Sequence, residues 1–174
     1  MSKPVVNGFR TTVSVVVPSY REDPDILVRC LGSWLAQNPD EIIIVIDVAD
    51  EEGQRRLAEV PDPRLNVLVY EHAGKRSALG VGIRAARGEI VVFADSDTWW
   101  QPGLLDAIQM PFEDPEVGGV GTQQNVYQRK TSIWRRIADW LINLRYYDYV
   151  PAQGGKGGVA CLSGRTAAYR RSVI

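Results

Sequence analysis

Two carboxylates, Asp95 and Asp97, stand two residues apart after an apolar run in the stretch EIVVFADSDTWWQPGLL, residues 89–105. Residues two apart in a β-strand point to the same face, so the two side chains would lie together if the strand continued. Neighbouring carboxylates repel each other unless a cation or hydrogen-bond donors lie between them. Mg2+ and Mn2+ prefer oxygen ligands, and Mg2+ is often held by one or two carboxylates plus substrate phosphates. The pair therefore indicates a site for a divalent cation.

A structural role for the same residues is the alternative. Asp and Ser are favoured at the N-terminus of a helix, and Asp95 and Ser96 precede a helix expected near Pro102. Short acidic patterns are common, so the pattern by itself favours capping. The residues at the other strand ends shift the balance towards the cation site.

Polar residues follow each of four apolar runs that are typical of buried strands. In open parallel sheets, ligands bind beyond the carboxyl ends of the strands, where side chains from several strands meet. The residues at these ends are Pro18, Ser19, Tyr20, Arg21, Glu22, Asp47, His72, Gly74, Lys75, Arg76, Asp95 and Asp97. The set as a whole indicates a binding site more strongly than any single member.

Lys75 and Arg76 open a predicted helix directly after Gly74. Cations at a helix N-terminus oppose the helix dipole, and an anionic ligand bound there would remove that conflict. An exposed basic pair without a ligand is the alternative.

The elements that must position these residues alternate along the chain. Strands are predicted at residues 12–20, 41–47, 65–70 and 89–95, with a further strand at 117–126, and helices at residues 23–37, 51–60, 75–88 and 101–112. This alternation predicts a mostly parallel, doubly wound α/β sheet with flanking helices. Asp23 is expected to cap the first helix, and Gly88 to end the third. The inner face of the first helix is expected to carry Ile26, Cys30, Leu31, Trp34 and Leu35.

Composition limits the class of protein. A chain of 174 residues is long enough for one domain, which we expect at residues 12–174 after a flexible tail at 1–11. The formal net charge of −1 gives no electrostatic reason to expect nucleic acid as a partner. Cys30 and Cys161 form no CxxC motif and are interpreted as reduced, buried thiols, with a single disulfide as the alternative. No window approaches eighteen uninterrupted apolar residues, so no transmembrane helix is predicted.

Four segments carry a resemblance to a known family. VSVVVPSYRED, IIIVIDVAD, AGKRSALGVGIRAARGEIVVFADSDTWWQPG and CLSGRTAAYRRSVI together resemble the processive glycosyltransferases of family 2, and most of all their hyaluronan-synthase-like branch. The resemblance runs from about Thr12 to Ile174, and GKR followed by DSDT is its most specific part. It implies a GT-A fold, a UDP-sugar donor, a glycan or polysaccharide acceptor, and Mg2+ or Mn2+.

The resemblance also implies roles for residues of the donor site. By matching motif, Pro18, Tyr20 and Glu22 would line the uridine pocket, with Tyr20 beside the base. Asp47 would contact the uracil or the ribose. Lys75 and Arg76 would lie near the nucleotide. One departure is Asp47-Val48, where many relatives have Asp-Asp or Asp-Gly.

The metal and acceptor sides are assigned in the same way. Asp95 and Asp97 match the metal motif, with Asp97 as the direct ligand, and Ser163 and Gly164 match a small-residue turn on the acceptor side. In the family, the acceptor hydroxyl attacks the anomeric carbon with inversion, and the general base follows the segment that matches SGRTAAYRRSVI. The base is therefore expected beyond Ile174. The chain is expected to be the donor-binding part of a longer enzyme, incomplete at the C-terminal side of the fold, that turns over poorly alone.

A basic, aromatic segment at residues 129–149 forms a further predicted helix. Its apolar residues recur at helical spacing, and basic residues outnumber Asp139 up to Arg145. An interfacial helix on an anionic membrane is one interpretation, and a helix packed on the edge of the sheet is the other. The apolar residues are Trp134, Ile137, Trp140, Leu141 and Leu144. With the resemblance, the first interpretation places the longer protein in the cytoplasm, at the inner face of the cell membrane.

Other functions remain open. A sugar nucleotidyltransferase usually carries a glycine-rich, basic loop after its first strand, where this chain reads PSYRED. A non-catalytic binding or assembly module of a membrane polysaccharide synthase fits a chain without the base motif. A plain α/β domain, with caps at the strand ends, does not explain why Asp47, Lys75, Asp95 and Asp97 gather at one edge. The sequence does not choose between UDP-N-acetylhexosamine, UDP-glucuronate and UDP-glucose as donor.

Overall fold

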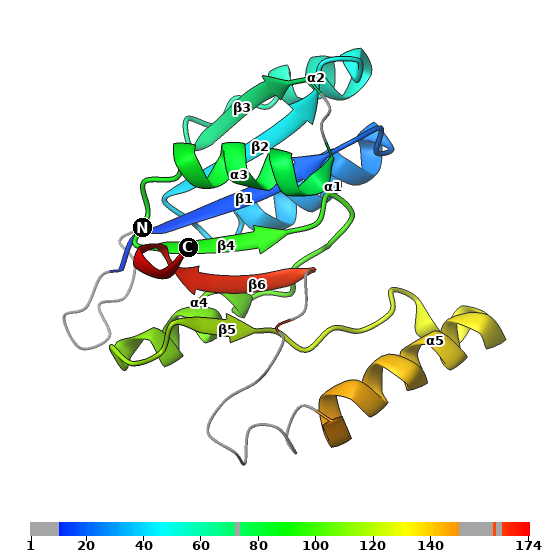
Figure 1. Ribbon diagram of the computed structural model, residues 1–174. Helices are drawn as coiled ribbons and strands as arrows, with labels where there is room; N and C mark the ends of the chain where they lie inside the picture. Colours follow the sequence, from blue (N-terminus) through cyan, green and yellow to red (C-terminus); the bar gives the residue numbers. More distant parts are fainter. Residues whose placement is uncertain (1–10, 72–73, 150–161, 163–164) are drawn as a thin grey trace. The chain divides into compact units, whose positions relative to one another are not determined.

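A mixed sheet is the centre of the computed structural model, which describes residues 11–71, 74–149, 162 and 165–174 (Figure 1). The contacts within the chain divide it into two units, residues 1–120 with 164–174, and residues 121–163. Each unit is described by itself.

The first four strands run parallel to one another. They are β1 (Val13–Ser19), β2 (Glu41–Asp47), β3 (Leu65–Tyr70) and β4 (Ile90–Ala94). The strand order is β3-β2-β1-β4-β6-β5, so the chain builds outward from β1 to β3 and then returns to place β4 on the other side of β1. This confirms the predicted α/β class and its mostly parallel sheet. The reversal between β1 and β4 is the kind of switch point at which ligands bind in open α/β sheets.

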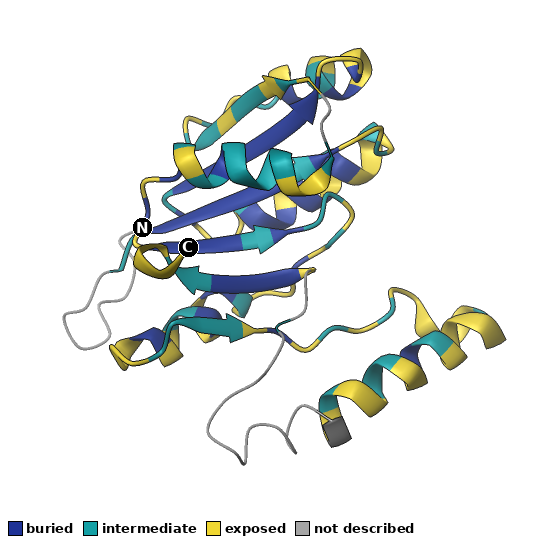
Figure 2. Ribbon diagram, viewed as in Figure 1, coloured by how far each residue is buried: buried dark blue, intermediate teal, exposed yellow. Residues whose placement is uncertain are grey.

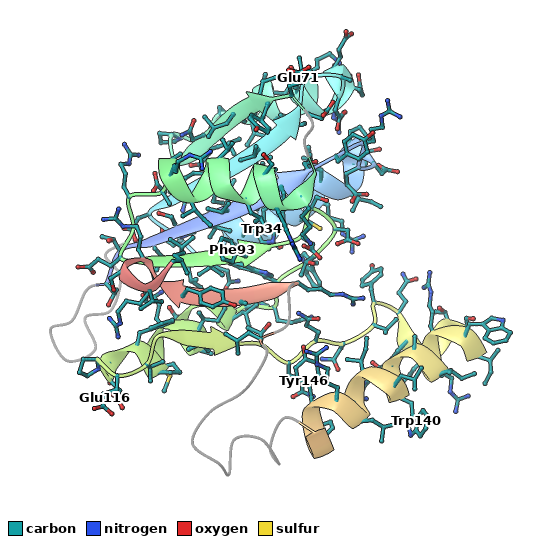
Figure 3. All side chains as sticks on the ribbon, in the orientation of Figure 1. Trp34, Glu71, Phe93, Glu116, Trp140 and Tyr146 are labelled. Atoms are coloured by element: carbon teal, nitrogen blue, oxygen red, sulfur yellow. The ribbon has the colours of Figure 1, made fainter. Side chains whose placement is uncertain are left out.

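Two further strands differ from the expectation. β6 (Thr166–Arg170) pairs antiparallel with β4, and no strand was predicted there. β5 (Gly119–Gly121) is much shorter than the strand predicted at 117–126. The ring centre of Phe93 on β4, labelled in Figure 3, lies 5.7 Å from the ring centre of Tyr169 on β6, so side chains of the two strands pack against each other.

Helices cover both faces of the sheet. On one face lie α1 (Pro24–Leu35), α2 (Glu51–Ala58) and α4 (Leu104–Gln109), followed by the short helix η1 (Met110–Glu113). On the other lies α3 (Lys75–Ala85) (Figure 1). Alternate residues of β1 point to opposite faces of the sheet, so Val15 packs in the core under α1 and Val16 packs in the core under α3. Every residue of β2 is buried, as expected for a strand covered on both sides (Figure 2).

The first helix begins as predicted, but its inner face is slightly rotated. The carboxylate of Asp23 accepts hydrogen bonds from the amides of Asp25 and Ile26, which confirms the cap. Ile26, predicted to face inward, is exposed, and Leu27 is fully buried in its place. The spacing of apolar residues is compatible with either Ile26 or Leu27 facing inward, and the packing of α1 against the sheet determines which of them is buried.

Glycine has a different role from the one predicted at the end of α3. The helix ends at Ala85, and Gly88 does not cap it. A Cβ on Gly88 would lie 2.5 Å from the main-chain nitrogen of Ser14, so the absence of a side chain allows the connection to pass against β1. The amide of Gly88 also donates a hydrogen bond to the Ser14 hydroxyl at 2.7 Å.

The second unit contains the predicted basic, aromatic helix. It consists of η2 (Arg129–Thr131), α5 (Ile133–Leu144) and a final turn, η3 (Arg145–Tyr149). The Ser132 hydroxyl accepts a hydrogen bond from the amide of Trp134 and caps α5. No helix in the described part of the chain is long and apolar enough to cross a membrane.

Candidate functional site

A pocket of about 250 Å³ opens at the switch point between β1 and β4. Three parts of the chain line it: the end of β1, the start of α3, and the residues that follow β4. The lining residues are Pro18, Ser19, Tyr20, Gly74, Lys75, Ala78, Asp95 and Ser96. Of the strand-end residues predicted from the sequence, the pocket thus brings together Pro18, Ser19, Tyr20, Gly74, Lys75 and Asp95.

An ion pair crosses this pocket. The ammonium of Lys75 lies 2.5 Å from Oδ1 of Asp95, and the side chains are 54% and 24% exposed. Lys75 is the first residue of α3, and the helix is preceded by Gly74 with a φ of 90°. Residues other than glycine rarely adopt such a φ, so Gly74 sets the direction in which α3, and with it Lys75, enters the site.

The two aspartates lie on a turn rather than on a continuing strand. β4 ends at Ala94, and the amide of Thr98 donates to the carbonyl of Asp95 at 3.0 Å. Asp95 lines the pocket and is partly buried, whereas Asp97 is exposed. The capping alternative is wrong, because α4 begins after Gly103 and no side chain caps it.

Helix α1 holds this turn in place through two tryptophans. The indole nitrogen of Trp34 donates to the carbonyl of Thr98 at 2.8 Å, and the amide of Trp100 donates to the Ser33 hydroxyl at 3.0 Å. The rings of Trp34 and Trp100 meet edge to face with their centres 6.4 Å apart, and both are buried. This support was not predicted from the sequence. The available signal was Trp34, expected on the inner face of the first helix, because an indole N–H usually finds a partner when it is buried.

Glu22 joins the loop after β1 to the same turn. Its carboxylate accepts a hydrogen bond from the Ser96 hydroxyl at 3.0 Å. Burial raises the pKa of the nearby Cys30 thiol to about 11, and the negative charges of Asp97 and Glu22 add to this effect. Cys30 itself is a free, buried thiol, as predicted.

The remaining predicted residues lie around the pocket or outside the described residues. Asp47 is buried at the end of β2, where its Oδ1 accepts a hydrogen bond from the amide of Ala49 at 2.8 Å. Arg76 is exposed in the first turn of α3. Neither lines the pocket. Ser163 and Gly164 lie outside the described residues, as does His72.

The chemistry of the pocket fits a divalent cation that is held jointly with a ligand. Asp95 already binds a positive charge, the ammonium of Lys75, and the exposed carboxylate of Asp97 lies on the same turn. Among the described residues, no group of three or more Asp, Glu, His or Cys side chains could hold a metal ion. One or two carboxylates would therefore need oxygen atoms from a bound phosphate group to complete the coordination.

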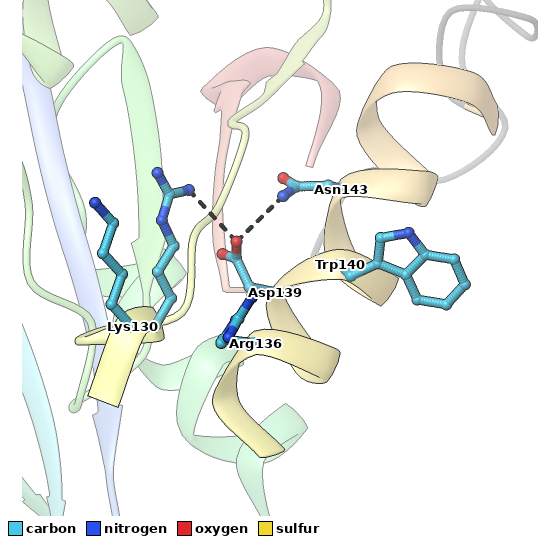
Figure 4. Close-up of a pocket in the computed structure, with 6 residues that line it drawn as sticks. Lys130, Arg136, Asp139, Trp140 and Asn143 are labelled. Carbon is cyan, nitrogen blue, oxygen red and sulfur yellow. Dashed lines mark hydrogen bonds and ion pairs between the residues drawn. The ribbon is translucent and has the colours of Figure 1, made fainter. Parts of the chain in front are cut away.

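A second hollow, of about 290 Å³, lies within residues 121–163 between η2 and α5 (Figure 4). Asp139 lies in it and is buried. Its carboxylate accepts hydrogen bonds from the amide of Val126, from Arg129 and from Asn143. These contacts tie the preceding loop to α5, so we interpret Asp139 as a structural residue.

Comparison with known proteins identifies the family of the chain. A family model described as "Glycosyltransferase like family 2" matches residues 10–174. The chain is 33% identical over 182 aligned residues to a type 2 glycosyltransferase of Pyricularia oryzae, covering 99% of this chain and 38% of the relative. It is 34% identical to an N-acetylglucosaminyltransferase of Sinorhizobium fredii, covering 99% and 44%. The chain thus spans less than half the length of these curated relatives.

Solved structures give the same fold. A mannosyltransferase from Pyrobaculum calidifontis, in complex with GDP-Man and Mn2+, superposes with a TM-score of 0.72 at 26% identity, covering 95% of this chain and 46% of that one. A glucosyl-3-phosphoglycerate synthase from Mycobacterium tuberculosis, in complex with UDP, superposes with a TM-score of 0.61 at 21% identity, covering 94% and 58%. The second likeness is evidence of the fold alone. With its GT-A fold and a family match over nearly all of its length, the chain belongs to family 2 of the glycosyltransferases.

Proposed function

We propose that this chain is the donor-binding part of a metal-dependent, inverting glycosyltransferase that uses a UDP-sugar. The observation that carries the proposal is the pocket at the β1–β4 switch point, where Tyr20, Lys75 and Asp95 come together from three separate elements. An aromatic ring, an ammonium and a carboxylate suit a base, a diphosphate and a metal ion respectively. The ligands named for the solved neighbours, GDP-Man with Mn2+ and UDP, support a nucleotide with a diphosphate.

The residues take the following roles in this proposal. Tyr20, half exposed in the pocket lining, stacks on the uracil next to Pro18, and Glu22 holds Ser96, which also lines the pocket. Asp47 contacts the uracil or the ribose from the end of β2. Lys75 and Arg76 bind the diphosphate at the start of α3, where the helix dipole also favours an anion. A domain at residues 12–174 would then contain the whole donor site.

Asp95 and Asp97 hold Mg2+ or Mn2+, with Asp97 as the direct ligand. When bound, the cation supplies positive charge that stabilises the departing diphosphate. The acceptor hydroxyl attacks the anomeric carbon from the face opposite UDP. The bond between that carbon and the diphosphate oxygen breaks, UDP leaves with the electron pair, and the hydroxyl proton passes to a general base. We propose that the base lies beyond Ile174 in the longer protein, and that Ser163 and Gly164 lie beside a glycan or polysaccharide acceptor.

The test is calorimetric titration of UDP into the folded chain, with and without Mn2+. We expect binding that requires Mn2+ and that is lost in Asp97→Ala and Asp95→Asn. Asp106→Asn, which removes an exposed carboxylate on α4, is the matched control and should bind as the parent chain does. Metal-independent binding, or equal affinity in all variants, would remove the proposed metal site. The titration does not require turnover, so it applies even if the chain alone is inactive.

We also propose that α5 and its flanks, residues 129–149, contact an anionic membrane surface at the cytoplasmic face of the cell membrane. The supporting observation is that the apolar face of α5 is the exposed one, with Trp134 at 76% and Trp140 at 60% exposure. At about 100° of rotation per residue, these two tryptophans lie at opposite borders of the apolar stripe. Arg145 lies beyond the first and Arg136 beyond the second, and both are exposed. Indoles and cations at the borders of an apolar stripe are typical of helices that lie in a membrane interface.

A further inference from the structure

The ion pair with Lys75 occupies the carboxylate of Asp95, which the proposed function assigns to binding a metal ion. Oδ1 of Asp95 already binds the Lys75 ammonium at 2.5 Å, and both residues line the pocket. The pair is not a buried structural bridge, because the Lys75 side chain is 54% exposed and free to move into solvent. Breaking it returns the Lys75 charge to water and leaves Asp95 partly exposed in the lining of the pocket, where another cation can reach it.

Helix stability does not explain a lysine at this position. Lys75 is the first residue of α3, where a positive charge opposes the helix dipole, and no acidic residue lies in the first turn. Arg76 follows it with the same charge and has no ion-pair partner among the described residues. The contact with Asp95 is thus specific to Lys75, although both cations lie at the same helix end.

We propose that Lys75 is a removable counter-ion of Asp95, which keeps the metal site closed until a diphosphate arrives. This inference rests on the proposed function, because it requires a diphosphate and a divalent cation as ligands. In the free protein, Lys75 neutralises Asp95. When a diphosphate binds, the flexible side chain of Lys75 turns to a phosphate oxygen, and Asp95 is released to hold a divalent cation together with Asp97.

A defined binding order follows. A divalent cation must compete with Lys75 for Asp95 in the free protein, so it binds weakly by itself. The diphosphate removes that competitor and adds its own oxygen ligands, so the cation binds more tightly. Because coupling between two ligands is reciprocal, the cation raises the affinity for the diphosphate by the same factor.

The experiment measures Mn2+ binding by the whole chain without nucleotide, from the loss of the free-ion signal in electron paramagnetic resonance. Lys75→Met removes the ammonium and keeps most of the aliphatic stem. Arg76→Met removes one positive charge from the same helix end but leaves the Asp95 pair intact, so it corrects for the general effect of charge. We expect Lys75→Met to bind Mn2+ roughly two- to fivefold more tightly than Arg76→Met, the range for a partly exposed ion pair. Adding Asp95→Asn to Lys75→Met should abolish the gain.

The same substitution, Lys75→Met, is expected to lower the affinity for the nucleotide. In calorimetry with saturating Mn2+, Lys75→Met should bind UDP more weakly than the parent chain, because the diphosphate loses a cation. Thermal unfolding checks that both variants fold. If Lys75→Met binds Mn2+ no more tightly than Arg76→Met while the parent chain shows Mn2+-dependent UDP binding, the counter-ion role is wrong and the proposed function stands. If the parent chain binds no UDP with Mn2+, both are overturned.

Discussion

The indole nitrogen of Trp34 on α1 donates a hydrogen bond to the main-chain carbonyl of Thr98, 2.8 Å away and 64 residues later in the chain. This contact holds the turn that carries Asp95 and Asp97 against a helix on one face of the sheet. The position of the two carboxylates therefore depends on a residue with no charge and no contact with the pocket.

Trp34→Phe tests this dependence. The substitution removes the N–H, leaves the Thr98 carbonyl without its partner, and opens a cavity at a fully buried site, so we expect a loss of about 2–4 kcal/mol of stability. Mn2+-dependent UDP binding should weaken in a sample that is still folded. Urea unfolding and calorimetry measure the two effects. Trp134→Phe, at an exposed position on α5, should change stability by less than about 0.5 kcal/mol.

Two glycines of α3 should respond to alanine with opposite signs. A Cβ on Gly82 would lie 2.3 Å from Cγ1 of Val16, so Gly82→Ala must push α3 away from β1 and should cost about 1–3 kcal/mol. Gly80 has only the end of the Arg84 side chain nearby, at 3.4 Å, so Gly80→Ala should stabilise the helix by about 0.5–1 kcal/mol. Chemical denaturation of both variants measures the difference. Equal effects would mean that the close packing of α3 on β1 is incorrect.

Glu41 is expected to link stability to pH. Burial raises the pKa of its carboxyl, but hydrogen bonds from the Ser14 hydroxyl and from the amide and guanidinium of Arg87 outweigh burial and hold the pKa below its usual value. A lowered pKa in the folded state means that the ionised group contributes stability above its unfolded pKa of about 4.3. That contribution is lost as the pH falls through the lower, folded pKa.

Glu41→Gln should therefore be less stable than the parent chain by about 2–3 kcal/mol at pH 7, through the loss of charge-assisted hydrogen bonds. The difference should shrink as the pH falls below about 4. Urea unfolding at a series of pH values measures it. Glu116→Gln, an exposed site with no side-chain hydrogen bond among the described residues, is the control at pH 7 (Figure 3). A difference that grows on acidification would contradict the lowered pKa.

The membrane contact of α5 is testable with vesicles. The chain should bind phosphatidylcholine vesicles that contain phosphatidylglycerol, and binding should weaken with salt. Reversing Arg136 and Arg145, the two cations at the borders of the apolar stripe, to Glu should reduce the affinity at least about tenfold, since each basic residue near the surface contributes about 1 kcal/mol. Arg55→Glu with Arg56→Glu, on α2, is the matched control. Equal binding to vesicles of phosphatidylcholine alone would instead indicate that the apolar face adheres without regard to charge.

Local sequence patterns were sufficient to predict most of the fold. The runs that became β1, β2 and β4 are nearly continuous apolar sequence, because inner strands of a parallel sheet are covered on both faces, and the polar residues after them mark where each strand stops. The outer strand β3 is recognisable although Asn66 and Val69 are exposed. The convergence of Tyr20, Lys75 and Asp95 on one pocket follows from that regularity. Asp23 was predictable as a cap because its role depends on the next three residues alone.

What could not be predicted depends on partners far away in the sequence. Thr166–Arg170 became a strand because β4 offered it an edge, and nothing in its own residues specifies that pairing. The exposure of Ile26 and the burial of Leu27 depend on how α1 rotates on the sheet. The bond from Trp34 to Thr98 and the pair between Lys75 and Asp95 likewise require the fold to be known.

The placement of β6 beside β4 has a consequence for synthesis of the protein. β4 ends at Ala94, and its antiparallel neighbour begins at Thr166. At about 5–20 residues per second, the ribosome needs roughly 4–14 seconds to make the intervening chain. During that time one edge of β4 has no strand to pair with, and an open edge is prone to join another chain. Among the inner parallel strands, the one that leads directly to Asp95 is thus the last to gain its second neighbour in the nascent protein.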